Sequence, residues 1–534
     1  MSTSRSWTCE GKPKDGKDYP NAFAHQPYEN FGPDCAICGL PREAIEVPKG
    51  KRPAAGAASG GSGRSGSGVG LAAGLITAAL VAALGGGAWF LWKAMHPGNA
   101  PSPNAVNPTL PNAAPADADR FSSGERTLFV YRGNFDRDRG IAAFAQGDYA
   151  QAATFFEKAA KSAPNDPEPQ IYYNNARARQ AGNPLVVATV VPINDKATSA
   201  EEILRGIADA QTQFNDAGGA KQRLLEVMIV NDGNDPAKAA AVAQQLSSNP
   251  AVLAVIGHNS SDASAKALPI YESAGLAMLS STSTSTVLSG KTFFRTVPSD
   301  QASGETLADY VINRLNIKQV GVFYDSTSNY SNSIQQAFTG KFTQLGGQVP
   351  QPPVDLSSST LDIKASLASA AGAVRAILLF PSTKTTSVAI AVARENAQLP
   401  AEQRLQLLGG DVMYNPTTLT DGGEAVKGLV LAVPWYPQTA YAKTAEQRWL
   451  GQVNWRTASS FDATKALTVA LSSATDRAGV VQALRSVNLS AAQTAGEPLQ
   501  FTPEGERVEK PILVEAVAGS AAPQGAKFGF QVVP

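Results

Sequence analysis

Apolar and polar residues alternate in blocks along the last two thirds of the chain, and each block has the length of a strand or a helix. Short runs of Val, Ile, Leu and Phe bounded by turn residues predict strands. These are Leu185–Val191, Leu224–Val230, Val252–Ile256, Leu276–Leu279, Val320–Tyr324, Ala376–Phe380, Leu405–Leu408 and Gly428–Val433. Helical periodicity lies between them, in Ala200–Asn215, Pro236–Leu246, Glu305–Arg314 and Thr385–Asn396.

Strands that alternate with helices indicate α/β architecture, with parallel sheets covered by helices on both faces. Residues 184–534 are too many for one such sheet. We therefore expect two parallel-sheet α/β lobes joined by a hinge. A ligand crevice is expected where the carboxyl ends of the strands meet.

A separate helical pattern precedes this region, in residues 121–183. Tyr149, Ala152, Phe156 and Ala159 recur at intervals of three and four, which places them on one face of a helix. The spacing resembles a tetratricopeptide repeat (TPR). A single repeat cannot bury its own face, so this TPR-like block must dock on a neighbour or on another copy. The pattern is compatible with a helical spacer and with a peptide-binding groove.

No charged residue occurs from Val69 to Trp92, and the run ends in aromatic residues. Such a helix is long enough to cross a bilayer, so residues 69–94 are predicted to form a single transmembrane helix. A Gly/Ala-rich segment outside the membrane is the alternative. Lys and Arg accumulate before the run, which predicts a cytoplasmic N-terminus, a bacterial inner-membrane location and a periplasmic C-terminal domain. A Gly/Ser linker (49–68) and a Pro/Ala/Asn-rich stalk (95–120) flank the helix.

Residues 1–48 contain all three cysteines of the chain and one of its three histidines. Cys9, His25, Cys35 and Cys38 supply the four ligands of a tetrahedral structural zinc site. A reducing cytosol favours a metal over a disulfide. An unstructured tail and a redox pair are the alternatives. No cofactor is expected for ligand binding.

The charge balance limits the classes of partner. Lys and Arg number 45, Asp and Glu also number 45, and the formal net charge is zero. A nucleic-acid-binding protein needs a basic surface to displace counterions from phosphates. We therefore expect no nucleic acid partner.

Short polar motifs follow the predicted strands in a definite order. They include Phe214-Asn-Asp-Ala-Gly-Gly, Val230-Asn-Asp-Gly, Val255-Ile-Gly-His-Asn-Ser-Ser, Ser280-Ser-Thr-Ser-Thr, Phe294-Arg-Thr-Val-Pro-Ser-Asp, Leu408-Gly-Gly-Asp and Phe461-Asp-Ala. Over about residues 185–534 this series resembles the leucine/isoleucine/valine-binding family of type I periplasmic substrate-binding proteins. The resemblance implies a two-lobed fold, binding of a solute without chemical conversion, and an ABC-transporter permease as partner.

The proposed ligand site combines the chemistry of an α-amino acid with this resemblance. A carboxylate is stabilised by hydroxyl groups and by the N–H groups at a helix N-terminus. Ser261 follows a strand and is expected to be the N-cap of the next helix. The resemblance implies that Ser261, Thr282 (through its backbone) and Thr284 hold the ligand carboxylate, that Asp411 holds the ammonium group, and that Tyr330 covers the ligand. Purely structural roles, as a cap, a loop or a rim residue, are the alternatives.

Two departures from the family pattern bear on the ligand. In the first strand–helix loop, where the family often has an aromatic residue or a glycine, this chain reads Asn194-Asp-Lys-Ala-Thr-Ser. Ser382 stands near a second position where the family has an aromatic residue. A pocket that loses aromatics and gains hydroxyls is more polar. This argues against a branched-chain ligand and leaves a polar amino acid, an amide or a urea-like solute.

Two functions follow as hypotheses. The first is a membrane-anchored solute-binding protein of an ABC transporter. The second is a solute sensor or scaffold that recruits partners through the zinc segment and the TPR-like block. A hydrolase built on His258, Ser261 and Asp262 is rejected, because side chains so close in one turn do not give a nucleophile–base–orienter geometry. The protein is therefore not expected to be an enzyme.

Overall fold

The computed structural model describes residues 7–9, 12–14, 28–30, 42–45, 119–519, 522 and 526–534. The chain divides into two units, Met1–Asn107 and Pro108–Pro534. In the first unit β1 (Trp7–Cys9) pairs antiparallel with β2 (Tyr28–Asn30), and α1 spans Arg42–Ile45. Cys9 is buried.

The predicted zinc site and membrane anchor fall largely outside the described residues. His25, Cys35 and Cys38 are not among them, and neither are residues 69–94. Within the described part of the chain, no three His, Cys, Asp or Glu side chains are grouped to hold a metal ion. No described helix has both the length and the apolar character that a membrane crossing requires. Zinc binding and anchoring stay predictions.

Lobe 1 of the second unit is built on a six-stranded sheet with the order β3-β5-β4-β6-β7-β8. All neighbours are parallel except β3, which runs antiparallel to β5. The strands are β3 (Phe121–Ser122), β4 (Leu185–Val191), β5 (Leu225–Asn231), β6 (Val252–Ile256), β7 (Ala277–Ser280) and β8 (Phe293–Arg295).

Helices cover both faces of the lobe 1 sheet, as the continuous apolar strands predict. On β4, Val187 packs into a core with α7 (Ala197–Asp216) and α16 (Trp455–Ser473), whereas Val186 packs into a core with α8 (Pro236–Ser248) and α9 (Ser261–Ser273). Lobe 1 also contains α15 (Ala440–Trp449), α17 (Arg477–Leu484), the short 3-10 helix η4 (Ala491–Gln493) and a hairpin of β14 (Asn488–Leu489) and β15 (Leu499–Gln500).

Lobe 2 is built on a seven-stranded sheet with the order β10-β9-β11-β12-β13-β16-β17. The strands are β9 (Val320–Tyr324), β10 (Val354–Asp355), β11 (Ala376–Phe380), β12 (Gln406–Gly409), β13 (Val430–Val433), β16 (Ile512–Ala518) and β17 (Phe528–Val532). The first five in the order are parallel, but β16 and β17 are antiparallel. The predicted parallel sheets are thus confirmed for most strands, and only β3, β16 and β17, which come from distant parts of the chain, are antiparallel.

Helices also cover both faces of the lobe 2 sheet. One face packs against α10 (Asp300–Asn313) and α11 (Asn329–Gln344). The other packs against α12 (Ile363–Ala371), α13 (Thr386–Gln398) and α14 (Pro416–Gly422). Short 3-10 helices lie in its connections: η1 (Ala401–Gln403), η2 (Asp411–Met413) and η3 (Gly423–Val426).

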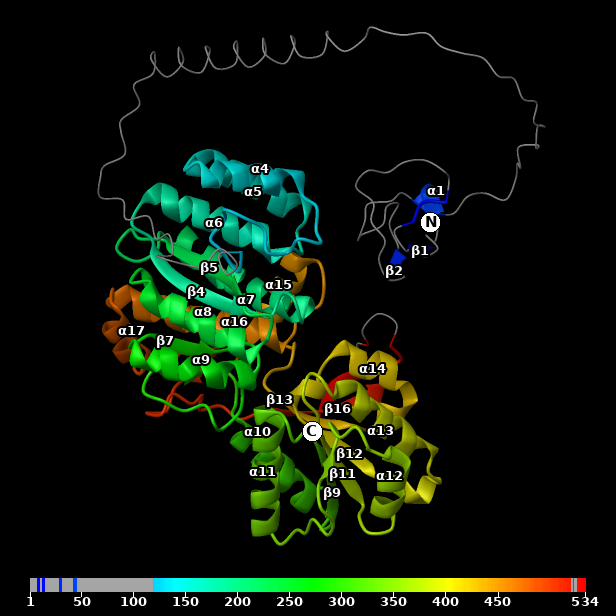
Figure 1. Cartoon of the computed structure of the whole chain (residues 1–534). Helices are drawn as coiled ribbons and strands as arrows, with labels where there is room; N and C mark the ends of the chain where they lie inside the picture. The colour runs from blue at the N-terminus through cyan, green and yellow to red at the C-terminus, as the bar shows by residue number, and fades with distance from the viewer. Residues whose placement is uncertain are drawn as a thin grey trace, which may run out of the picture. The chain divides into compact units, whose positions relative to one another are not determined.

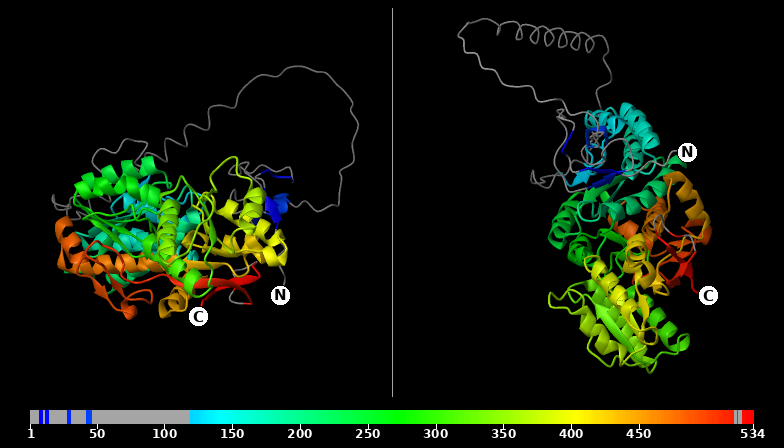
Figure 2. Two further views of the ribbon diagram at one scale, coloured as in Figure 1. Left: turned by 90° about the horizontal axis from the view of Figure 1, so that it is seen from below. Right: turned by 90° about the vertical axis from the view of Figure 1, so that its right-hand side faces the viewer.

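The chain passes between the lobes three times, after β8, after β13 and after β15. Figure 1 shows lobe 1 around β4–β7 and lobe 2 around β9–β13, with the β13–β16 pair where the lobes meet. The right-hand view of Figure 2 shows the two lobes from the side. The two-lobed α/β prediction is confirmed.

The helical block in front of lobe 1 consists of α4 (Phe135–Ala145), α5 (Tyr149–Ser162) and α6 (Pro167–Ala181). Ala152, Phe156 and Ala159 are fully buried, so the predicted face of α5 is a packing face. The block shares one core with lobe 1 and therefore docks on a neighbour. It lies at the end of lobe 1 remote from lobe 2 (Figures 1 and 2). The TPR assignment itself stays a prediction.

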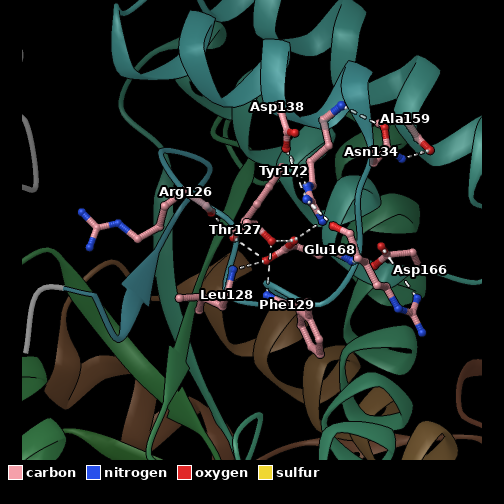
Figure 3. A network of polar contacts seen from close by, with 12 residues as sticks. Arg126, Thr127, Leu128, Phe129, Asn134, Asp138, Ala159, Asp166, Glu168 and Tyr172 are labelled. Atoms are coloured by element: carbon pink, nitrogen blue, oxygen red, sulfur yellow. Dashed lines mark hydrogen bonds and ion pairs between the residues drawn. The ribbon is translucent and has the colours of Figure 1, made fainter. Parts of the chain in front are cut away.

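A buried glutamate fixes α6 to the segment before the block. Figure 3 shows the Glu168 carboxylate facing the turn of Thr127 and Leu128. It accepts hydrogen bonds from the Thr127 hydroxyl (2.6 Å), the Leu128 N–H (2.7 Å) and the Tyr172 hydroxyl (3.0 Å). Arg137 lies 3.6 Å from the same carboxylate. Burial raises the pKa of Glu168 to about 7.

Candidate ligand-binding site

A cavity of about 260 Å³ lies between the two lobes, at the carboxyl ends of strands from both sheets. Lobe 1 lines it with Asn234, Pro236, Asn259, Ser260, Ser261, Asp262, Lys266, Thr282, Thr284, Trp455 and Arg456. Lobe 2 lines it with Thr327, Ser328, Asn329, Tyr330, Ser382, Thr383, Lys384, Asp411 and Val412. This is the position that a two-lobed α/β fold provides for a ligand.

All five predicted ligand-binding residues line this one cavity: Ser261, Thr282, Thr284, Tyr330 and Asp411. Each is at most 7% exposed. They come from four connections that follow β6, β7, β9 and β12. Parallel strands collect these connections at one edge, although more than 120 residues of sequence separate the first from the last.

Two helix N-termini, one from each lobe, reach the cavity. They belong to α9, through Ser260 and Ser261, and to α11, through Asn329 and Tyr330. The N–H groups and the helix dipole make such ends favourable for an anion. The α11 end already holds the Asp262 carboxylate, which accepts the Asn329 N–H, so the α9 end is the one suited to a ligand carboxylate.

The predicted cap position was wrong by one residue. Ser260 is the N-cap of α9, and its hydroxyl accepts the Ala263 N–H (3.3 Å). Ser261 is the first helical residue, and its hydroxyl accepts the Ser285 N–H (3.4 Å). Neighbouring serines are equivalent in sequence, and the backbone turn decides which one caps. The change leaves Ser261 on the cavity wall.

Hydroxyl groups of the loop after β7 line the lobe 1 side. The Thr282 hydroxyl donates to the Asn259 carbonyl (2.8 Å) and holds this loop against the one that follows β6. The Thr284 hydroxyl is buried and faces the Asp300 carboxyl group without a geometrically regular hydrogen bond within residues 119–519. A buried hydroxyl without a partner costs roughly 1–3 kcal/mol. A ligand or a water molecule at Thr284 would relieve that cost.

Asp411 provides a buried negative charge on the lobe 2 side. It opens η2 directly after β12 and is 5% exposed. Burial raises the pKa of Asp411 to about 6, against the opposing effects of Tyr330 and Arg456. The Tyr330 hydroxyl faces this carboxylate without a geometrically regular hydrogen bond in the described part of the chain. At neutral pH the site therefore presents a carboxylate suited to a cationic group.

A second buried carboxylate lies behind this wall. Asp300 is fully buried, and neither of its oxygens has a regular hydrogen-bond partner within residues 119–519. Burial, and secondly the charge of Asp411, raise the pKa of Asp300 to about 8. The protonated form is thus favoured more at Asp300 than at Asp411, so the negative charge of the pair falls mainly on Asp411.

Sequence reasoning missed the contribution of α16. Trp455 and Arg456, in its first turn, line the cavity. The Trp455 indole N–H and the Arg456 Nε–H are buried without acceptors among the described residues. Their only sequence signal is an aromatic–basic pair after the N-cap Asn454. No local sequence pattern shows that this turn lies at the cleft.

Ser382, which departs from the family pattern, does line the cavity, whereas the loop that begins at Asn194 does not.

His258 does not form a catalytic group with Ser261. Its ring is fully buried; Nδ1 lies 2.7 Å from Asp232 Oδ2, and Nε2 lies 3.0 Å from the Tyr271 hydroxyl oxygen. Both ring nitrogens are therefore engaged away from the cavity. The residue holds the β6–α9 connection in place.

Residues 195–521 match the family described as periplasmic binding protein, and the chain belongs to this family. An amino acid binding protein of Pseudomonas aeruginosa is 28% identical over 153 residues, which are 28% of this chain and 41% of that protein. A leucine-, isoleucine-, valine-, threonine- and alanine-binding protein of the same species is 30% identical over 149 residues, 27% and 40% of the two chains. The matched segments thus span about two fifths of these curated relatives.

Solved structures share the fold over a larger part of the chain. A leucine binding protein of Thermotoga maritima has a TM-score of 0.56 at 22% identity, covering 65% of this chain and 98% of that one. A branched-chain amino acid transporter substrate binding protein of Streptococcus pneumoniae, in complex with isoleucine, has a TM-score of 0.55 at 18% identity and covers 66% and 99%. The two-lobed architecture is common to all three.

Proposed function

We propose that this protein binds an amino acid, or a closely related small polar solute, between its two lobes and delivers it to an ABC-transporter permease. The observation that carries the proposal is the interlobe cavity, which places two helix N-termini and several hydroxyls together with the buried carboxylate of Asp411. The names of the relatives, which describe amino acid binding, support the same ligand class.

In this proposal the ligand carboxylate lies at the α9 N-terminus. Ser261, the backbone of Thr282 and the buried hydroxyl of Thr284 donate hydrogen bonds to it. The ammonium group lies against Asp411, and the Tyr330 ring covers it. The cavity volume is below the range typical of drug-sized ligands, which agrees with a small solute.

A thermal-shift screen of the purified chain against amino acids, amides and urea tests this function. A ligand present at 100 times its Kd stabilises the folded state by about 2.7 kcal/mol, so a true ligand raises Tm measurably. Thr284→Val should abolish or weaken the shift, whereas Thr360→Val, at an exposed residue outside the cavity lining, serves as the matched control. A screen without any stabilising solute would contradict the proposal.

Coupling to transport needs a second experiment. A strain that lacks the protein should lose high-affinity uptake of the solute that the purified chain binds. Unchanged uptake despite tight binding would instead support the sensor or scaffold hypothesis. Closing of the two lobes on a ligand is the change that either a permease or a signalling partner would read.

The location is part of the same proposal. The uncharged run from Val69 to Trp92 and the basic residues before it support an inner-membrane anchor with a periplasmic C-terminal domain. Protease added to spheroplasts should then digest residues after 95 and spare the N-terminal segment. Zinc at Cys9, His25, Cys35 and Cys38 is tested by metal analysis of the purified chain, with Cys35→Ser as the comparison.

A further inference from the structure

Few of the residues that line the cavity are apolar. Apart from the ring of Tyr330, the apolar residues that line it are Pro236, Val412 and Trp455. The others carry hydroxyl, amide or charged groups. Polar groups that a ligand removes from water need hydrogen-bond partners, which an aliphatic side chain does not supply. The polar residues of the wall therefore favour a solute with a polar far end.

Two lysines of this wall carry positive charges that are not in ion pairs with other described residues. Lys266, on α9, belongs to lobe 1, and Lys384, in the connection between β11 and α13, belongs to lobe 2. Both are exposed, and neither ammonium group has an ion pair or a side-chain hydrogen bond in the part of the chain that the structure describes. Two like charges on facing lobes repel one another unless an anion lies between them.

The other charged groups of the cavity are already engaged. Arg456 lies 3.4 Å from Glu202. Asp262, one turn before Lys266, accepts the Asn329 N–H from the other lobe (3.0 Å). In the proposed function, Asp411 binds the ammonium group of the ligand. The two lysines are thus the charged residues that can contact a further charged group of the ligand.

Unpartnered donors are a second feature of this wall that favours a ligand with acceptor oxygens. The indole N–H of Trp455, which is 1% exposed, and the Nε–H of Arg456 have no acceptor among the described residues. Both groups can only donate. A ligand rich in acceptor oxygens satisfies such donors, whereas a second cationic group or an alkyl group does not.

We infer that the solute is an acidic amino acid, whose second carboxylate lies between Lys266 and Lys384. This inference rests on the proposed function, which supplies the sites of the α-carboxylate and the ammonium group. The second carboxylate links the two lobes, because it is attracted by one lysine from each. Binding of the acid therefore favours the closed arrangement more than binding of a neutral analogue does.

Isothermal titration of the full-length protein at pH 7.5 tests the inference. Glutamate and aspartate should bind at least about tenfold more tightly than glutamine, asparagine and leucine, the range expected for a charge-assisted contact. Lys266→Met and Lys384→Met should each lower glutamate affinity toward that of glutamine and leave glutamine affinity nearly unchanged. Lys364→Met, on the exposed surface of α12, is the matched control.

Salt gives a second readout of the same contact. Raising NaCl from 50 to 500 mM should weaken glutamate binding more than glutamine binding, because screening acts on the extra charge. The two lysine variants should lose this difference.

The outcomes separate the two proposals. Tighter binding of leucine or glutamine than of either acid overturns the acidic ligand and leaves amino acid binding intact. Equal effects of Lys266→Met on glutamate and glutamine also overturn it. If an amide or urea binds but no amino acid does, the acidic ligand is overturned and the proposed function stands; if none of these solutes binds, the proposed function itself is wrong.

Discussion

At the scale of single residues, the site depends on two carboxylates with different protonation. Burial raises the pKa of both, to about 6 for Asp411 and to about 8 for Asp300. Because Asp411 also raises the pKa of Asp300, the two groups do not both ionise at neutral pH. The result is one negative charge, on the residue that lines the cavity.

Binding of an amino acid should therefore depend on pH through Asp411. Its ionised form attracts the ammonium group, so affinity should be constant above about pH 7. It should fall about tenfold per unit below pH 6, as the carboxylate takes up a proton. Titration calorimetry from pH 5 to pH 8 measures this profile.

Asp411→Asn should remove both the affinity and its pH dependence. Loss of a buried charge partner costs roughly 2–5 kcal/mol, so binding should weaken about a hundredfold or more, with a flat profile. Asp421→Asn, exposed on α14, should match the wild type. An unchanged affinity in Asp411→Asn would remove Asp411 from the site.

At the scale of elements, the contact between α7 and α16 depends on Gly206. A Cβ at this position would lie 2.0 Å from the Thr457 carbonyl oxygen and 2.7 Å from the Phe461 nitrogen. These are backbone atoms of a fully packed helix, so they have no room to move aside. The close approach also positions the first turn of α16, and with it Trp455, on the cavity wall.

Gly206→Ala should destabilise the protein by about 3 kcal/mol, because overpacking forces the two helices apart. Gly340→Ala is the matched control, since nothing lies within 4 Å of a Cβ at that position of α11. It should stabilise the protein by about 0.5–1 kcal/mol through helix propensity. Urea denaturation of both variants measures the contrast. Equal effects would mean that the helices separate easily.

The Glu168 network is the other element-scale feature, and it links docking of α6 to pH. The pKa of Glu168 is about 7 in the folded state against an ordinary value of 4.5. The folded protein therefore holds a proton that the unfolded chain releases between these values. The contribution of protonated Glu168 to the free energy of unfolding is therefore complete below pH 4.5. This contribution, about 3 kcal/mol, is lost as the pH rises through 7.

Glu168→Gln should remove this dependence. As the pH rises from 4.5 to 8, the unfolding free energy of the wild type should fall relative to that of the variant, since the amide does not titrate. Glu157→Gln, at a partly exposed glutamate of α5, should follow the wild type. Thermal unfolding across the pH range measures the difference. A constant difference would show that Glu168 titrates normally.

At the scale of the whole molecule, contacts beside the cavity join the two lobes. The Asp262 carboxylate accepts the Asn329 N–H (3.0 Å), and the Ser285 hydroxyl donates to the Asn329 carbonyl (3.1 Å). The Ser333 hydroxyl accepts the Thr286 N–H (2.9 Å). Such bonds exist only while the lobes are together, so they bias the equilibrium toward the closed arrangement.

Asp262→Ala should shift this equilibrium toward the open arrangement. A charge-assisted hydrogen bond contributes about 1.5 kcal/mol. The affinity for every ligand should therefore fall by the same factor, about tenfold. Small-angle scattering should show a larger radius of gyration without ligand. Loss of affinity for one ligand alone would instead place Asp262 in direct contact with that ligand.

The sequence by itself determined the regular elements and much of the candidate site. The predicted strands Leu185–Val191 and Val320–Tyr324 are observed with the same bounds, because buried parallel strands are continuous apolar runs between turn residues. The predicted site residues Ser261 and Asp411 share one cavity, because parallel strands direct their following loops to one edge. Their role in binding is the part that experiments must establish.

Only the tertiary structure decided which distant segments complete the sheets and the cavity. The antiparallel β16 and the first turn of α16 take their places after the chain has crossed between the lobes. A local pattern does not record such crossings, because it reports which side of a segment is buried and not which partner buries it. For the same reason the polar far wall, with Trp455, Arg456 and a lysine from each lobe, became visible only in the folded molecule.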